Sequence, residues 1–200
     1  MPAKMNTVSM PSSPTARWSK RGFTLIELMA VVVITGILAV AGVSLFQQQL
    51  LASKGTEAVS VIQAIRAAEE AYAAENHVYL NVSTASGGTS WYPNTTPNTT
   101  RYAWVQDGHA DYTGPDKKGG WRALAPSVNR SVLFGYLVNA GEAGTIVPEL
   151  QLAAKPTFPS PMVVSWYVIQ ARGDVNGNGV FAQYAASNLN GELFIENEGE

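Results

Sequence analysis

Cysteine is absent from the 200 residues of this chain. Disulfide bridges, thiolate catalysis and cysteine-ligated metals are therefore excluded. Charged residues are also scarce, at 14% of the chain, whereas hydrophobic residues make up 46%. This composition predicts a packed core beneath a lightly charged surface, in one domain of ordinary size with an appendage.

Acidic residues are missing from the first 22 positions, whose four bases are Lys4, Arg17, Lys20 and Arg21. The rest of the chain contains nine bases and all fifteen acids, so its formal net charge is −6. A mainly acidic chain does not favour binding to nucleic acid, and we predict no nucleic-acid partner.

Motifs that would support catalysis are also lacking: there is no Gly-x-Ser-x-Gly elbow, no phosphate-binding loop and no zinc-ligand spacing. Asp107, His109 and Asp111 alternate and would share one face of a strand as metal ligands. The glycine at position 108 favours a solvated loop instead. We therefore expect no enzymatic activity, and a membrane-anchored periplasmic enzyme is kept only as an alternative.

A long apolar run is present, by contrast, at residues 25–46. Five of its 22 positions interrupt it, namely Glu27, Thr35, Gly36, Gly42 and Ser44. As an α-helix the run would span about 33 Å, which is enough to cross a hydrocarbon core of about 30 Å. The bases precede it, which predicts a single pass with the N-terminus in the cytoplasm.

The order of these segments differs from that of an ordinary secretory signal, in which the apolar core precedes the cleavage site. Here the polar leader ends in Lys20-Arg21-Gly22 and the apolar segment follows it, so cleavage after Gly22 would leave the helix on the mature chain. Glu27 lies near the start of that helix, where a carboxylate costs roughly 2.5–3.5 kcal/mol and needs a partner or a role.

The stretch Gly22-Phe23-Thr24-Leu25-Ile26-Glu27, between bases and a long apolar helix, resembles the cleavage and methylation motif of type IV prepilins and pseudopilins. The resemblance implies that residues 1–22 are a leader peptide. It implies that a prepilin peptidase cuts between Gly22 and Phe23 and methylates the new Phe23 amine. It also implies that Phe23 and Glu27 act in assembly.

The same resemblance implies a subunit held in the bacterial inner membrane until an inner-membrane assembly platform draws it into a helical filament. That filament would contain copies of this chain, alone or with related subunits. It would be an extracellular pilus or a periplasmic pseudopilus.

Removal of the leader would expose an α-amino group, whose reference pKa of about 7.7–8.0 leaves it mostly charged at neutral pH. Glu27 lies one helical turn away and would pair with this amine in its own subunit or in an adjacent one. Pairing with a neighbour would fix the axial register of a docking subunit. The alternative is a plain membrane anchor in which Glu27 only reaches the interface.

Apolar residues continue beyond the run at spacings of three and four, as Val61, Ile65, Ala68 and Tyr72. We predict one helix with a hydrophobic membrane and polymerisation half at residues 23–50 and an amphipathic half at 51–76. Four charged residues are expected on other faces of this half, namely Glu57, Arg66, Glu69 and Glu70. Two helices broken near Lys54-Gly55 are the alternative.

Residues 77–200 are expected to form a globular head of antiparallel strands packed on the helix, which gives an α+β, pilin-like fold. The strands are predicted at residues 101–106, 132–139, 162–171, 180–185 and 193–196, and an exposed loop at about 81–120. The expected core aromatics are Trp104, Trp121, Phe134, Tyr136, Trp166, Tyr167 and Phe181.

The segment 173–179, Gly-Asp-Val-Asn-Gly-Asn-Gly, predicts a hairpin turn between two of these strands. Asp174, Asn176 and Asn178 also match the first half of a calcium loop, although position 185 is alanine where such a loop carries glutamate. No cofactor is required for the expected function. A structural calcium ion at these three residues is compatible with the hairpin.

These features favour a structural subunit of a type IV pilus, either a major or a minor pilin. The long head and its loop separate this reading from the alternative, a pseudopilin of a type II secretion system. A membrane-anchored binding module is a further alternative, but it would need neither Glu27 nor the processing site.

Overall fold

The computed structural model describes residues 22–83, 91–113, 119–153 and 155–200. The expected leader therefore lies outside the described residues, apart from Gly22. The chain divides into two compact units, Met1–Val43 and Ser44–Glu200. Each unit is considered by itself below.

The helix α1, Leu25–Asn76, is 52 residues long and begins in the first unit. Its first part is apolar and long enough to cross a membrane by length and composition. Its later residues carry the spacing that the sequence predicted, because Ala58, Val61, Ile62 and Ile65 are all buried. The single predicted helix is confirmed, and the alternative of two helices broken near Lys54-Gly55 is wrong.

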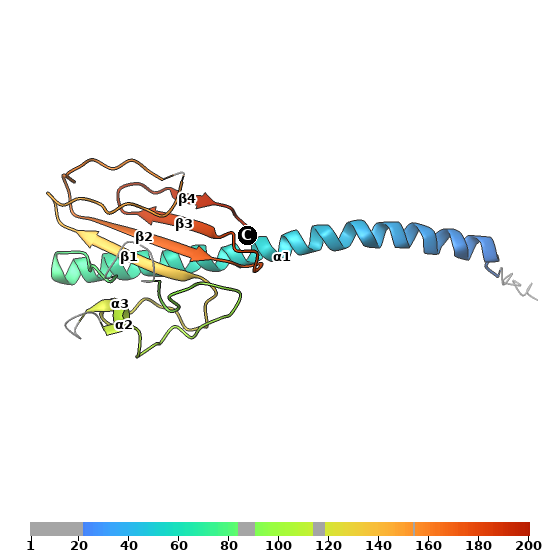
Figure 1. Cartoon of the computed structure of the whole chain (residues 1–200), viewed down its shortest axis with the longest axis horizontal. Helices are drawn as coiled ribbons and strands as arrows, with labels where there is room; N and C mark the ends of the chain where they lie inside the picture. Colours follow the sequence, from blue (N-terminus) through green and yellow to red (C-terminus); the bar gives the residue numbers. More distant parts are fainter. Residues whose placement is uncertain (1–21, 84–90, 114–118, 154) are drawn as a thin grey trace, which may run out of the picture. The chain divides into compact units, whose positions relative to one another are not determined.

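Four antiparallel strands form one sheet in the order β1-β2-β3-β4. They are β1 (Gly135–Gly141), β2 (Trp166–Gly173), β3 (Ala182–Ser187) and β4 (Leu193–Glu196). Figure 1 shows them side by side, with the later part of α1 running along the sheet. The α+β fold is confirmed, and the predicted strand at 193–196 matches β4.

Alternation along the strands gives the sheet two buried faces. Tyr167, Ile169 and Tyr184 pack with α1 in the main core. On the other face, Trp166 and Val168 pack with a second cluster that includes residues of the β1–β2 connection, namely Leu150, Leu152 and Met162. The second unit is therefore built from α1, the sheet and a long connection that covers the opposite side.

The predicted strand at residues 101–106 is wrong. Only Tyr102 pairs there, in an isolated bridge with Val132. The Tyr92 hydroxyl donates to the Trp104 carbonyl and accepts from Gln106 N, so side-chain contacts take the place of a ladder.

The predicted exposed loop at 81–120 is also wrong for much of its described part. Trp91, Tyr92 and Trp104 are buried, and Tyr92 packs on Trp104 and Trp121 with ring centroids 5.1 and 5.2 Å apart. Short helices α2 (Ala110–Thr113) and α3 (Gly120–Leu124) follow. Among the expected core aromatics, only Phe181 is partly exposed, where the Arg172 guanidinium lies 3.6 Å from its ring.

Two of the expected outward-facing acids on α1 are buried, which corrects the prediction: Glu57 is 7% exposed and Glu69 is 0% exposed. The spacing contained the signal, because Glu57 precedes Val61 by four residues and Glu69 follows Ile65 by four, on the apolar face. Glu69 Oε2 accepts a hydrogen bond from Leu80 N at 2.9 Å. Glu69 therefore anchors the start of the head to α1.

Burial raises the pKa of Glu69 to about 8, the Leu80 hydrogen bond lowers it, and Glu70 raises it further. The folded state consequently holds a proton on Glu69 at neutral pH, where the unfolded chain does not. An uncharged carboxyl is far less costly to bury than a carboxylate.

Gly55 lies where α1 approaches β3. A Cβ atom on Gly55 would lie 2.5 Å from Tyr184 Oη and 3.6 Å from Tyr184 Cζ. Both residues are buried, so neither has room to move aside. The glycine that suggested a helix break is instead required for close packing of the helix on the sheet.

The substitution Gly55→Ala is expected to destabilise the second unit by about 1–3 kcal/mol, because it overpacks a buried contact. Tyr184→Phe removes the clashing atom. Tyr184 Oη has no hydrogen-bond partner among the described residues, so this variant alone should be close to neutral. The double variant should regain wild-type stability or exceed it, since alanine favours a helix over glycine by about 1 kcal/mol.

We compare the stability of wild type, the two single variants and the double variant by thermal unfolding. Each full chain is held in uncharged detergent micelles and followed by near-ultraviolet circular dichroism. The two substitutions should be strongly non-additive. Additive effects would contradict the steric explanation.

We expect the free energy of unfolding to fall as pH rises from about 4.5 to about 8, because the folded state binds an extra proton on Glu69 in this window. Glu69→Gln should remove that slope and keep an acceptor for Leu80 N. The free energy of unfolding of Glu69→Gln should exceed that of wild type by little at pH 5 and by the order of a few kcal/mol at pH 8. Unfolding curves across this range, with the exposed Glu75→Gln as matched control, test this. An equal gain at both pH values would contradict it.

Candidate functional site

The predicted processing site lies just before α1. Residues 22–24 are not helical, and Gly22 and Phe23 are exposed, Phe23 at 85%. A peptidase requires an accessible peptide bond outside a helix, and the bond between Gly22 and Phe23 has both properties. Cleavage there stays a prediction.

The helix begins with a capping box formed by Thr24 and Glu27. Glu27 N donates to Thr24 Oγ1 at 3.3 Å, and Thr24 N donates in return to Glu27 Oε2 at 3.2 Å. The Thr24 hydroxyl also donates to Glu27 Oε2, at 3.1 Å. Sequence reasoning missed this role of Glu27, although Thr-x-x-Glu before an apolar run is its signature.

Every atom of this capping box lies after the expected scissile bond, so removal of the leader leaves it intact. Both capping hydrogen bonds to the carboxylate use Oε2, and Oε1 accepts none from the described residues. Glu27 therefore uses one carboxylate oxygen for its own helix, and the other is not engaged by the described residues. No contact joins Glu27 to Phe23 here, and their pairing stays a prediction.

The hairpin predicted at residues 173–179 is confirmed, because β2 and β3 pair on either side of it. Its polar side chains bind the turn itself. Asp174 Oδ1 accepts from Gly177 N at 2.6 Å and Asp174 Oδ2 from Gly179 N at 3.1 Å. Asn176 Oδ1 and Asn178 Oδ1 each accept the backbone N–H two residues on, at 2.9 and 2.7 Å.

The amide nitrogens of the same two asparagines face Glu200. Asn176 Nδ2 and Asn178 Nδ2 donate to Glu200 Oε2 at 2.9 and 2.6 Å, and Val175 N donates to the Glu200 carbonyl at 3.0 Å. Calcium takes oxygen ligands, and this arrangement turns N–H groups toward the carboxylate. The residues as placed do not fit the ion, and calcium at Asp174, Asn176 and Asn178 stays a prediction that would require the amides to turn.

Asp107, His109 and Asp111 do not share a strand face, because the chain turns into α2. His109 Nε2 donates to the Trp91 carbonyl at 3.0 Å, which leaves Nδ1 to accept from Asp111 N at 3.1 Å. Asp111 is buried. No three His, Asp or Glu side chains gather as metal ligands within the described ranges.

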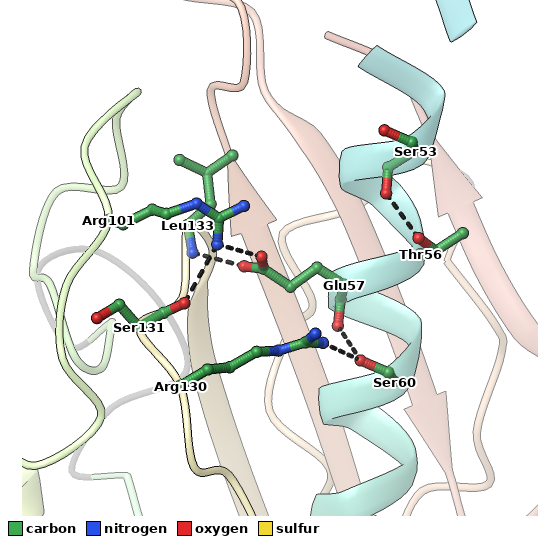
Figure 2. A network of polar contacts seen from close by, with 8 residues as sticks. All are labelled: Ser53, Thr56, Glu57, Ser60, Arg101, Arg130, Ser131 and Leu133. Carbon is green, nitrogen blue, oxygen red and sulfur yellow. Dashed lines mark hydrogen bonds and ion pairs between the residues drawn. The ribbon is translucent and has the colours of Figure 1, made fainter. Parts of the chain in front are cut away.

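A polar network around Glu57, shown in Figure 2, is the feature that sequence reasoning missed most completely. The Glu57 carboxylate forms an ion pair with Arg101 and accepts from Leu133 N at 2.6 Å. Arg101 Nη1 also donates to the Ser131 carbonyl at 3.1 Å, and Arg130 Nη2 donates to Ser60 Oγ at 2.8 Å. Two loops are thus bound to α1.

Comparison with known proteins gives a matching family and two similar proteins. The family described as the prokaryotic N-terminal methylation motif matches residues 19–43. Prepilin peptidase-dependent protein D of Escherichia coli is 35% identical over 104 residues, which cover 50% of this chain and 68% of that protein. Type II secretion system core protein G of Pseudomonas aeruginosa is 37% identical over 111 residues, which cover 55% and 77% respectively. No solved structure was found to match.

The matched methylation motif includes the exposed, non-helical Gly22-Phe23 bond and the capped start of α1. A long helix followed by an antiparallel sheet completes the expected layout. Both relatives are matched over more than two thirds of their own length. The chain belongs to the type IV pilin and pseudopilin family.

Proposed function

We propose that this protein is a structural subunit of a type IV pilus, a major or minor pilin, assembled through α1 after a prepilin peptidase removes residues 1–22. One observation carries the proposal. The large apolar side chains of residues 25–46 are exposed along α1, each by more than half. Near the start of this run, the Glu27 carboxylate caps the helix. Before assembly a membrane covers this surface, and in a filament the helices of other subunits cover it.

Processing supplies the cation that this surface needs. Hydrolysis of the Gly22-Phe23 bond gives the leader a new carboxylate and gives Phe23 a new amine, which methylation leaves basic. The Glu27 carboxylate offers Oε1 to such an amine, while Oε2 keeps the capping box. In a low-dielectric bundle of helices this pair sets the axial register of an incoming subunit.

The size of the head supports a pilus subunit over a secretion pseudopilin. Buried aromatics pack together within residues 91–113 and 119–124, and part of the β1–β2 connection packs on one face of the sheet. Such additions enlarge the surface that a fibre outside the cell presents. Before assembly, we place the chain in the inner membrane with its N-terminus in the cytoplasm.

The second candidate is a pseudopilin of a type II secretion system, with a periplasmic filament. It is favoured by the 37% identity to a core protein of such a system, over 77% of that protein. Both candidates share the processing and assembly steps and differ in where the filament ends.

Mass spectrometry of fibres sheared from the native host tests the choice. We expect this chain among the fibre proteins, beginning at methylated Phe23, and its deletion should remove or shorten the fibres. Absence from the fibres together with a secretion defect on deletion would assign it to the pseudopilus. Recovery only with residues 1–22 attached would contradict both candidates.

Two variants separate the charge of Glu27 from its capping role. Glu27→Gln keeps an acceptor for the capping box and removes the charge, so it should be processed normally and yet incorporate poorly into filaments. Thr24→Ala keeps the charge and loses the N-cap hydroxyl, at a cost of about 1 kcal/mol to the helix. It should incorporate nearly as well as wild type.

Incorporation is read from filament yield, and processing from the intact mass of the membrane-bound pool. Because a neutral glutamine enters a membrane more easily than glutamate, a defect in Glu27→Gln cannot come from failed insertion. Normal incorporation of Glu27→Gln, or an equal defect in Thr24→Ala, would rule out the pairing mechanism.

A further inference from the structure

Three cations line one pocket in the second unit, and two of them, Arg101 and Arg130, belong to the network in Figure 2. Lys54 belongs to α1, whereas Arg101 and Arg130 come from separate loops. They are three of only nine bases after residue 22, in a part of the chain whose net charge is −6. Their convergence on a pocket of about 460 Å³ creates a local positive site on an acidic protein.

Glu57, the one acid that lines this pocket, does not neutralise it. Its carboxylate is held by Arg101 and by Leu133 N, and it is 7% exposed. Neither Lys54 nor Arg130 has a carboxylate partner among the described residues, where Lys54 donates to the Val175 carbonyl and Arg130 to Ser60 Oγ. Three cations and one acid leave the site with a formal charge of +2.

The hydroxyl groups of the pocket do not supply hydrogen-bond donors for a ligand. Those of Ser53, Thr56 and Ser60 donate to backbone carbonyls one turn earlier on α1. The donors for a ligand are therefore the ammonium and the two guanidinium groups. A guanidinium carries five N–H donors, and the contacts described for Arg101 and Arg130 use one nitrogen of each.

A buried hydroxyl lies close to the same charges. Tyr136 is 0% exposed, and its hydroxyl has no hydrogen-bond partner among the described residues. Burial raises the pKa of Tyr136, and so does the nearby Glu57 carboxylate, whereas Arg130 and Arg101 lower it. The charges of the ion pair and of Arg130 therefore act on the Tyr136 hydroxyl, although Tyr136 does not line the pocket.

We propose that this pocket binds a phosphate group, supplied by free phosphate or by the headgroup of an anionic phospholipid. Phosphate suits the site because its oxygens accept several N–H donors at once, and paired guanidinium groups match that geometry. The pocket has room for an ester substituent as well as the phosphate. The inference does not depend on the filament proposal, since it concerns the unassembled chain.

Isothermal titration calorimetry of the full chain in uncharged detergent micelles, at constant ionic strength, tests this site. One arm titrates inorganic phosphate, and the other titrates phosphatidylglycerol into the micelles. Arg130→Gln, which leaves the Arg101–Glu57 pair in place, should weaken binding about tenfold. Arg122→Gln is the matched control, because Arg122 is an exposed arginine on α3 outside the pocket, and it should change binding less than about twofold.

Unchanged melting temperatures for both variants establish that they are folded, and Lys54→Gln supplies an independent loss of one cation if Arg130→Gln is unstable. Saturable binding of inorganic phosphate would support a free-ion source, and binding of phosphatidylglycerol alone would support a headgroup source. Binding of neither probe would overturn the proposal, as would equal weakening by Arg122→Gln.

Discussion

The first part of α1 exposes an apolar surface that is unfavourable in contact with water. Its large apolar side chains, from Leu25 onward, are exposed in the isolated chain and project around the whole helix rather than along one stripe. Such a helix must lie in lipid or among other apolar helices. Glu27 has a structural role at its start, because its carboxylate accepts the hydrogen bonds that cap the helix.

The later part of the same helix meets the opposite requirement, since it must bury one face against a sheet. Gly55 permits close approach to β3, and apolar residues at spacings of three and four fill the interface. Glu57 and Glu69 sit within that face and accept hydrogen bonds from the backbone of segments that follow the helix, at Leu133 and Leu80 respectively. The polar groups on the buried side therefore select which loops lie against the helix.

Periodicity, the position of the bases and the turn residues were sufficient to predict the helix, the β2–β3 hairpin and the last strand. They failed in the segment after residue 81, where tertiary contacts of Tyr92 override local strand propensity. Glu57 and Glu69 were assigned to solvent by residue type, although their spacing placed them on the apolar face. The capping box is readable in the sequence as Thr-x-x-Glu, but the cost of a carboxylate in an apolar run points first to a partner amine or to the membrane interface.

Arg101, Arg130 and Lys54 could not have been grouped from the sequence, because nothing local links positions that lie up to 76 residues apart. Their meeting depends on the path of two irregular loops, which the antiparallel sheet and the aromatic cluster fix. Chemistry that arises from such loops is visible only once the fold is known.

The long sequence separation of the helix contacts bears on how the protein is made. Lys54 binds the Val175 carbonyl and Arg66 the Ser187 carbonyl, each 121 positions away. A ribosome adds roughly 5–20 residues each second, so the apolar face of the later part of α1 emerges several seconds before β2 and β3 exist to cover it. During that interval the nascent chain has its most adhesive surface uncovered, because the strands that bury it have not yet been made.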